Sequence, residues 1–323
     1  MKYTTLGRTG LQVSRIAFGT WQLGGDWGPT DESAAISAIR HAADQGVTLF
    51  DTAQAHGFGA SEQLLAKALV GLDRSKPVIA TKGGLRPGPG GGVSRDSSPA
   101  RIQAGIESSL RALNTDYIDL YQVHWPDPAV PFADTTETIG TLIADGKIRH
   151  AGVSNFDVRQ MAEFSDTLPV ETLQPPYHLF RRGIEAAILP YAASHDIGVL
   201  VYGPLAHGLL SGGMTGATSF ATADWRSRSD MFTGDQFARN LAAVAALARV
   251  AGDDLGVPVS RLAVAWTLAN PFVHAAVVGT RNSAHIDDVI AAADLIVDSD
   301  VLRQIDSVLA VAAPTGGPTP ASV

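Results

Sequence analysis

Charged side chains follow three short apolar or β-branched runs of this sequence. Asp51, Lys82 and His124 each come directly after such a run. An acid beside an amine forms an ion pair, and a nearby imidazole can exchange protons or orient a polar substrate. Each residue alone also has an ordinary interpretation: Asp51 caps a loop or helix start, Lys82 is a solvated strand end, and His124 donates to a backbone carbonyl. Those interpretations weaken if the three converge, because buried opposite charges must pair.

A second group of polar and small residues follows the later runs. It comprises Ser154 with Asn155, Gln174, Tyr202, and Gly279-Thr280-Arg281. Side chains that combine donors, acceptors and an aromatic ring in one cavity can bind and orient a small molecule. The sequence therefore predicts a ligand site, provided that the fold brings these positions together.

Eight short runs are expected to be strands. They are 14–18, 48–50, 78–81, 119–123, 150–153, 172–174, 199–202 and 275–278. Stretches with apolar residues at three- and four-residue spacing lie between them and predict helices, for example 33–43, 62–69, 102–113, 136–143 and 184–193. Strand–helix alternation predicts a parallel sheet. Eight such units in about 300 residues favour a (β/α)₈ TIM barrel over an open doubly wound sheet, with the polar strand ends at one mouth.

Segments outside these units also carry predictions. Residues 3–5 and 12–14 are expected to form an N-terminal β-hairpin that caps the closed end of the barrel. Residues 83–98 contain a proline- and glycine-rich run and are expected to be a mobile loop, whereas 211–234 is long enough for a lid or a binding segment. We expect one domain over residues 1–313 and a disordered tail at 314–323.

Composition excludes several classes of protein. The 323 residues carry a net charge of −8 and no cysteine, which excludes disulfides, thiolate catalysis and iron–sulfur clusters. The acidic balance argues against a nucleic-acid or anionic-membrane partner. No apolar leader segment opens the chain, so we expect a cytoplasmic protein, and a monomer as the simplest state. None of the nine histidines forms a His-x-His pair, so no metal site is predicted and a metal-dependent hydrolase is disfavoured.

Several blocks of sequence together resemble the aldo-keto reductases. They are Phe50-Asp-Thr-Ala53, Ala80-Thr-Lys-Gly83, Asp116-Tyr-Ile-Asp-Leu-Tyr-Gln-Val-His-Trp-Pro-Asp127, Gly152-Val-Ser-Asn-Phe156, Gln174-Pro-Pro-Tyr177, Tyr202-Gly-Pro-Leu205 and Gly279-Thr-Arg281. The resemblance runs from about residue 3 to about residue 310, with the blocks in the order typical of the family. It implies a (β/α)₈ barrel that reduces carbonyl compounds with NADPH through an Asp, Tyr, Lys and His tetrad.

The resemblance assigns three members of that tetrad and departs at the fourth. Asp51, Lys82 and His124 match, but His56 stands where the tyrosine proton donor is expected. A neighbouring ammonium opposes the protonated imidazole, so impaired reduction with retained cofactor binding is the hypothesis. Three interpretations of His56 stay open: a working acid in a natural variant, a residue introduced to weaken catalysis, or an inert residue in an NADP(H)-binding sensor with little turnover.

The resemblance also implies where NADPH or NADP⁺ binds. Ser154, Asn155 and Gln174 match the residues that hold the nicotinamide carboxamide, and Tyr202 matches the ring that stacks on the nicotinamide. The segment over the pyrophosphate corresponds to Gly203, Leu205, Gly208 and Leu210. The block that favours NADPH over NADH and contacts the adenine comprises Gly279, Thr280, Arg281, His285 and Asp288, with Arg281 clamping the 2′-phosphate.

The substrate side is predicted from the aromatic residues near the expected mouth. Trp21 follows the first strand of the barrel and Trp125 follows His124. Such rings can line a pocket for an aldehyde or a ketone, although aromatic side chains in these places also serve as loop packing. A small-molecule carbonyl compound is therefore the expected partner.

Overall fold

The structure is a computed structural model, and it describes residues 1–25, 27–28, 30–88, 92–222, 224–280, 282, 284–310 and 312. Within this part of the chain, eight parallel strands close into a barrel in the order β10-β11-β12-β3-β4-β5-β8-β9. Their bounds are β3 Ile16–Gly19, β4 Leu49–Asp51, β5 Val78–Gly83, β8 Ile118–Val123, β9 Ile148–Ser154, β10 Thr172–Gln174, β11 Gly198–Tyr202 and β12 Ala275–Val278. The predicted (β/α)₈ barrel is confirmed, and each of the eight expected strands is present within two residues of its predicted bounds.

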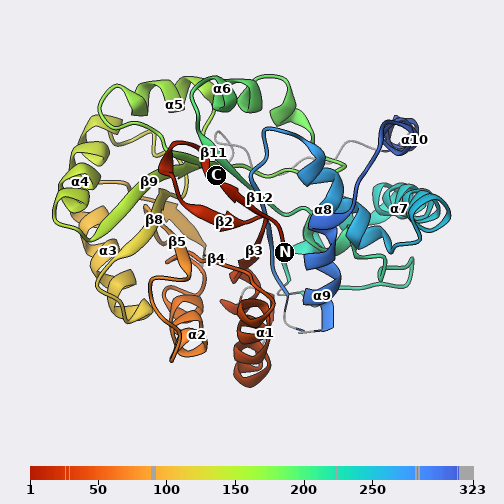
Figure 1. Ribbon diagram of the computed structural model, residues 1–323, viewed down its shortest axis with the longest axis horizontal. Helices are drawn as coiled ribbons and strands as arrows, with labels where there is room; N and C mark the ends of the chain where they lie inside the picture. The colour runs from red at the N-terminus through yellow and green to blue at the C-terminus, as the bar shows by residue number, and fades with distance from the viewer. Residues whose placement is uncertain are drawn as a thin grey trace.

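Helices surround the barrel (Figure 1). They are α1 Glu32–Asp44, α2 Ala60–Leu69, α3 Pro99–Leu113, α4 Phe132–Ala144, α5 Val158–Ser165, α6 Ile188–Ser194, α7 Gly234–Leu255, α8 Val259–Ala269, α9 Ala284–Ala291 and α10 Ser299–Leu309. Local sequence begins several of them: the Asp31 carboxylate accepts from two amides of the first turn of α1, and Asp157 forms a capping box with Gln160 at α5. Helices α7 and α10 pack against each other to one side of the ring (Figure 1).

The N-terminal hairpin closes one end of the barrel, as expected. Strands β1 (Tyr3–Thr5) and β2 (Gln12–Ser14) pair antiparallel around the short helix η1 (Gly7–Thr9). Leu6 and Val13 of this hairpin are buried in one apolar cluster with inward-facing strand residues, including Leu49, Leu120 and Leu200. The hairpin therefore plugs the end at which the strands begin, and the strand ends that carry the predicted site lie at the opposite mouth.

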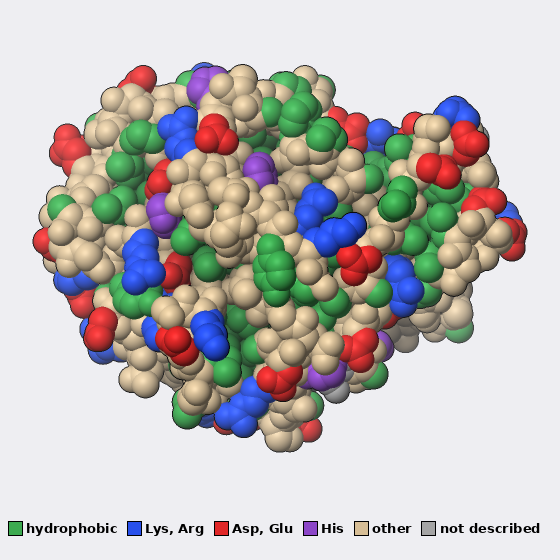
Figure 2. All heavy atoms as spheres, viewed as in Figure 1, with side chains coloured by type: hydrophobic (Ala, Val, Ile, Leu, Met, Phe, Trp, Pro, Cys, Tyr) green, Lys and Arg blue, Asp and Glu red, His purple; other side chains and the backbone are tan. Residues whose placement is uncertain are grey.

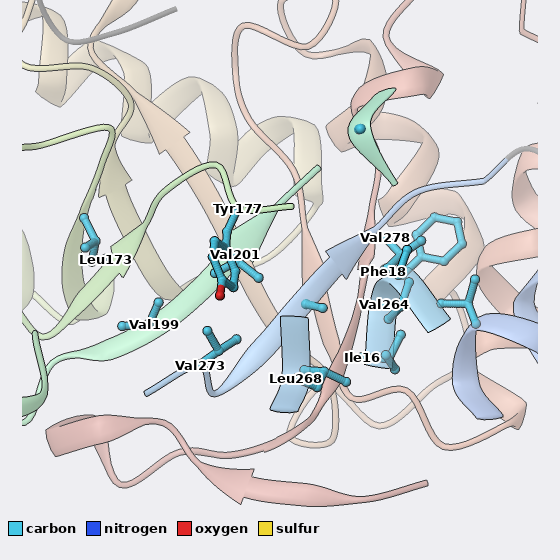
Figure 3. Packing of buried hydrophobic residues seen from close by; sticks show 14 of the residues in the cluster. Ile16, Phe18, Leu173, Tyr177, Val199, Val201, Val264, Leu268, Val273 and Val278 are labelled. Atoms are coloured by element: carbon cyan, nitrogen blue, oxygen red, sulfur yellow. The ribbon is translucent and has the colours of Figure 1, made fainter. Parts of the chain in front are cut away.

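A second apolar layer lies between the strands and the helices. Figure 3 shows Val264 and Leu268 of α8 beside Ile16, Phe18 and Val278 of the neighbouring strands. Because successive strand residues point to opposite faces, the outward-facing residues bind the helices while the inward-facing ones fill the barrel. This double layer holds the strand ends in fixed positions.

Two predictions about local structure were wrong. Residues 83–98 are not only a loop, because β6 (Leu85–Pro87) and β7 (Val93–Arg95) pair as a short antiparallel hairpin. The helix expected over 184–193 is divided into a 3₁₀ turn η4 (Gly183–Glu185) and α6. Pro190 explains the break, since its ring clashes with the carbonyl of the residue four positions earlier, Ala186, in a continuous helix.

The predicted lid or binding segment, 211–234, contains the short 3₁₀ helices η6 (Trp225–Arg228) and η7 (Asp230–Phe232). A further 3₁₀ helix, η5 (Ala206–Ser211), ends where this segment begins. Among the described residues, no helix is both long enough and apolar enough to span a membrane. On the face that Figure 2 shows, acidic and basic side chains are interspersed. The disordered tail expected at 314–323 lies outside the described residues.

Candidate active site

A buried ion pair lies at the mouth of the barrel. Asp51 is the last residue of β4, and Lys82 lies near the end of the adjacent β5. The Lys82 Nζ atom lies 2.7 and 2.8 Å from the two carboxylate oxygens of Asp51 and 2.9 Å from the carbonyl oxygen of Thr52. The lysine side chain is only 2% exposed. All three ammonium hydrogens therefore have acceptors, as a buried charge requires.

Two amide side chains extend this ion pair across the barrel. Gln174 Nε2 donates to Asp51 Oδ1 at 2.7 Å and to Gln122 Oε1 at 3.2 Å, and Gln122 Nε2 donates to Thr172 Oγ1 at 3.3 Å. Both hydrogens on Gln174 Nε2 are thus used, which fixes the orientation of its amide. Sequence analysis missed Gln122. Gln122 lies directly opposite Lys82 in the register of β5 and β8, a pairing that no local sequence pattern shows.

Two imidazole rings lie edge to face beside the ion pair. The rings of His56 and His124 have centroids 5.9 Å apart and lie nearly perpendicular. Burial lowers the pKa of both imidazoles, and the positive charge of Lys82 is the next largest cause. The pKa of His124 falls to about 3, and the pKa of His56 falls well below its ordinary value. Each ring has a buried Nδ1 atom that bonds to none of the residues the structure describes. Both imidazoles are therefore neutral at physiological pH.

A tight turn after β4 positions His56. The backbones of Gly24 and Gly57 touch: a Cβ on Gly24 would lie 2.6 Å from the His56 carbonyl carbon, and one on Gly57 would lie 2.4 Å from the Gly24 oxygen. Only glycine permits this approach. The Trp21 ring, in η2 (Trp21–Leu23), lies nearly parallel to the His56 ring with centroids 6.3 Å apart. His56 is held between Trp21 and His124.

Ser154, Asn155 and Tyr202 form a hydrogen-bonded group at the ends of β9 and β11. Asn155 Nδ2 donates to the His124 carbonyl oxygen at 3.1 Å and lies 3.0 Å from Ser154 Oγ, while the Tyr202 hydroxyl donates to Asn155 Oδ1 at 2.9 Å. Asn155 adopts a left-handed backbone conformation, with φ of 63°. Such strain persists where surrounding contacts hold it and is common at functional sites. The structure thus brings these three predicted residues together.

The segment after β11 turns sharply through left-handed backbone. Gly203 and Gly208 have φ of +68° and +97°, and His207 between them has φ of 56°. Leu210 is buried and Leu205 is half-buried against the apolar core. The predicted pyrophosphate segment is therefore a strained turn anchored by its leucines.

Aromatic rings surround this turn. The His207 ring contacts Trp21, Trp27 and Trp225 at centroid distances of 5.8, 6.3 and 4.9 Å, and it lies 6.4 Å from His178. Burial lowers the pKa of His207 to about 4. Sequence analysis missed His207, and no motif in the sequence distinguishes it. The segment 211–234 thus contributes Trp225 to a ring cluster that reaches His56 through Trp21.

Trp125 and the residues after β12 lie in different surroundings. Trp125 is buried, and the Arg95 guanidinium carbon lies over its ring, 5.7 Å from the ring centroid. Gly279 packs closely against Gln22, His285 Nδ1 lies 3.5 Å from Thr280 Oγ1, and Asp288 accepts from Arg261 at 2.5 Å. Arg281, predicted to clamp a 2′-phosphate, lies outside the described residues.

Glu62 is a second buried acid that sequence analysis missed. It lies in α2, fully buried, and its Oε1 accepts from the Thr81 hydroxyl at 2.7 Å. Burial raises its pKa above the ordinary value. Thr81 precedes Lys82 and points to the opposite face of β5, so Glu62 lies outside the barrel wall.

Among the described residues, no group of three or more His, Asp or Glu side chains is arranged to hold a metal ion.

Comparison with known proteins agrees with this geometry. The model of the aldo/keto reductase family matches residues 15–310. The chain is 42% identical over 311 residues to the aldo-keto reductase YhdN of Bacillus subtilis, covering 96% of this chain and 94% of that protein. The chain belongs to the aldo/keto reductase family. The resemblance seen in the sequence is therefore confirmed.

Solved structures of aldo-keto reductases share the fold. A glycerol dehydrogenase from Gluconobacter oxydans superposes with a TM-score of 0.87 at 38% identity, covering 95% of both chains. An aldo-keto reductase from Klebsiella pneumoniae in complex with NADPH superposes with a TM-score of 0.76 at 28% identity, covering 98% of both chains. Membership of the family makes the chain an oxidoreductase of carbonyl compounds.

Proposed function

We propose that this chain catalyses the reversible, NADPH-dependent reduction of aldehydes and ketones to alcohols, with the reductive rate limited by His56. One observation carries the proposal: the buried Asp51–Lys82 ion pair lies beside two neutral imidazoles at the open mouth of the barrel. A buried acid–amine pair next to groups that can exchange a proton supports acid–base chemistry of the kind that carbonyl reduction uses.

The residues at the mouth fit a nicotinamide. Both hydrogens on Gln174 Nε2 are used within the protein, so its Oε1 is the atom left to accept from the amide of a carboxamide. At Gly203, a Cβ would meet only the His207 ring within 4 Å, so the backbone after β11 leaves room for a close approach. Support also comes from the aldo-keto reductase of Klebsiella pneumoniae, whose structure is a complex with NADPH.

The roles of this chain's residues follow from their contacts. When bound, the reduced nicotinamide supplies a hydride to the carbonyl carbon. His124 is buried and neutral, so its ring can donate one hydrogen bond to a carbonyl oxygen and orient it. Lys82 adds a positive field that favours the negative charge developing on that oxygen, and Asp51 holds Lys82 in place. Trp21 closes one side of the site.

Variants at position 56 test the role of His56. We expect the wild-type protein to oxidise NADPH slowly in the presence of an aldehyde, and His56→Tyr to be faster by about 10²–10⁴-fold, the usual contribution of general acid catalysis. The measurement is NADPH absorbance with a panel of aldehydes and ketones. His56→Phe is the matched control, because it fills the site without a proton donor. A His56→Tyr rate at or below that of the wild type would contradict the proposal that His56 limits the reductive rate.

Cofactor binding is tested separately by fluorescence titration. We expect NADPH to bind more tightly than NADH, because a guanidinium at Arg281 can hold a 2′-phosphate in two hydrogen bonds. Arg281→Ala should remove the preference and leave NADH affinity unchanged. Equal affinity for both cofactors in the wild type would contradict this assignment. Tight NADPH binding without turnover, even in His56→Tyr, would favour the second candidate, a cofactor sensor, which the neutral His56 ring supports.

A further inference from the structure

The outer face of β5 changes from apolar to polar at the strand end that carries Lys82. Ile79 points outward and is buried in the apolar layer between the strands and the helices, whereas Thr81, the next outward-facing residue, is polar and fully buried. Glu62 of α2 binds Thr81 there and is itself fully buried. A buried acid costs free energy that an apolar pair at these two positions would not. The stability of the layer therefore does not account for the acid.

The two residues that flank Lys82 are both held from outside the barrel. The Thr81 hydroxyl donates to Glu62 Oε1 at 2.7 Å. A Cβ on Gly83 would lie 2.0 Å from the hydroxyl oxygen of Tyr121, so this hydroxyl packs directly on the backbone of β5. Tyr121 also lies opposite Thr81 in the register of β5 and β8. These contacts fix the stretch of backbone from which the Lys82 side chain extends.

Glu62 also lies close enough to Lys82 to respond to its charge. The positive charge of Lys82 is among the causes that lower the pKa of Glu62, although burial, the largest cause, raises it overall. On the inner face of the strand, the Asp51 carboxylate binds the same ammonium at 2.7 and 2.8 Å. Lys82 thus has a direct counter-ion inside the barrel and a second buried acid behind the strand that carries it.

We propose that Glu62 is a positioning residue for Lys82: by binding the Thr81 hydroxyl, it fixes the end of β5 and with it the place of the Lys82 ammonium at the mouth. This inference rests on the proposed function, in which the positive field of Lys82 favours the negative charge that develops on the carbonyl oxygen. Glu62 lies outside the barrel wall and acts only through Thr81. Loss of this bond should therefore lower kcat and leave the KM values for the carbonyl compound and NADPH nearly unchanged.

A double variant separates positioning from stability. Glu62→Leu with Thr81→Val replaces both partners by apolar side chains, so the bond is lost without leaving either partner unpaired, and the midpoint of denaturation should stay close to that of the wild type. We expect kcat for NADPH oxidation with an aldehyde to fall by about 2- to 12-fold, the range that corresponds to one hydrogen bond. Glu62→Gln keeps an acceptor for Thr81 and should retain most of the wild-type kcat.

Thr267→Val is the matched control for the double variant. It removes a buried hydroxyl whose bond, to the Val264 carbonyl oxygen at 2.7 Å, lies within α8. Its kcat should equal that of the wild type. A double variant whose kcat falls no further than that of Thr267→Val overturns the inference. A Glu62→Gln kcat as low as that of the double variant also overturns it, because an acceptor for Thr81 would then not be what positions Lys82.

A second measurement needs neither cofactor nor turnover. The Lys82 ammonium makes three bonds, to the two Asp51 carboxylate oxygens and the Thr52 carbonyl oxygen, and these bonds slow the exchange of its hydrogens with water. NMR of the lysine side-chain nitrogens follows this exchange in the ligand-free protein, with Lys82→Arg used to assign the signal. We expect exchange to be faster by at least about twofold in the double variant and unchanged in Thr267→Val.

The two measurements distinguish failure of this inference from failure of the proposed function. Equal exchange of the Lys82 hydrogens in the wild type and the double variant overturns the positioning role, even if the protein is an active reductase. Faster exchange in the double variant, together with a wild type that neither binds NADPH nor turns over, would instead contradict the proposed function.

Discussion

The two ends of the barrel interior differ although the same strands build both. Near the closed end, Leu49 and Leu120 are part of the apolar cluster plugged by Leu6. Two residues further along the same strands, on the same inward face, stand Asp51 and Gln122. One pleat of about 6.6 Å therefore separates an apolar layer from a buried polar layer. The apolar layer near the closed end, here the lower layer, stabilises the fold by burying hydrophobic side chains. The polar layer near the mouth, here the upper layer, is costly to bury unless every polar group is paired.

Breaking the ion pair of the upper layer should have the largest effect. Lys82→Met leaves the Asp51 carboxylate buried without its counter-ion, so we expect the free energy of unfolding to fall by about 3–5 kcal/mol. The rate of NADPH oxidation should fall by about 10²–10⁴-fold, because the positive field at the carbonyl oxygen is lost. Denaturant unfolding and steady-state rates measure the two effects.

The double variant Asp51→Asn with Lys82→Met separates these effects. It removes both charges, so most of the lost stability should return while the activity stays low. If the double variant is as unstable as Lys82→Met alone, the cost lies in packing rather than in the unpaired charge. The description of the upper layer as charge-dependent would then be wrong.

Truncation in the lower layer should act on stability alone. Leu6→Ala opens a cavity beneath the strands, and we expect the free energy of unfolding to fall by about 2–5 kcal/mol. The catalytic rate of the folded protein should be unchanged, since the hairpin touches the end opposite the mouth. Rates measured well below the unfolding transition check this. A rate loss that matches the Lys82→Met variant would remove the functional distinction between the two layers.

Gln122→Leu should have a smaller effect, and mainly on cofactor affinity. The substitution removes the acceptor that holds one Gln174 hydrogen, so the Gln174 amide can rotate away from the orientation that a carboxamide needs. One neutral hydrogen bond is worth about 0.5–1.5 kcal/mol, so NADPH affinity should weaken by about 2- to 12-fold with little change in kcat. Fluorescence titration measures the affinity.

Thr172→Val is the matched control for Gln122→Leu. It removes the acceptor of Gln122 Nε2 but leaves the contact between Gln122 and Gln174. Its effect on NADPH affinity should be the smaller of the two. A loss equal to that of Gln122→Leu would mean that general loosening of the barrel, rather than the orientation of Gln174, controls affinity.

The sequence predicted the barrel well because its apolar runs and helical spacings reflect local geometry. Asp51, Lys82 and His124 were found for the same reason, since each lies near the end of a strand or directly after it. Gln122 and His207 were missed on different grounds. Gln122 lies inside an apolar strand and its role depends on register with β5, whereas the position of His207 depends on a left-handed turn and on three tryptophan rings from other segments. Such contacts between distant segments leave no local pattern.

Glu62 can be compared with Asp51, because both are buried acids beside β5, Asp51 on its inner face and Glu62 on its outer face. We expect its variant to have the smallest effect. Its raised pKa means that the folded protein holds the Glu62 proton more tightly than the unfolded chain does. The stability from this group is therefore present below the unfolded pKa and lost as pH rises through the folded pKa. Glu62→Gln keeps the acceptor for Thr81 and does not titrate. The unfolding free energy of the wild type should therefore fall relative to this variant as pH rises, and a difference that is constant with pH would contradict the raised pKa of Glu62.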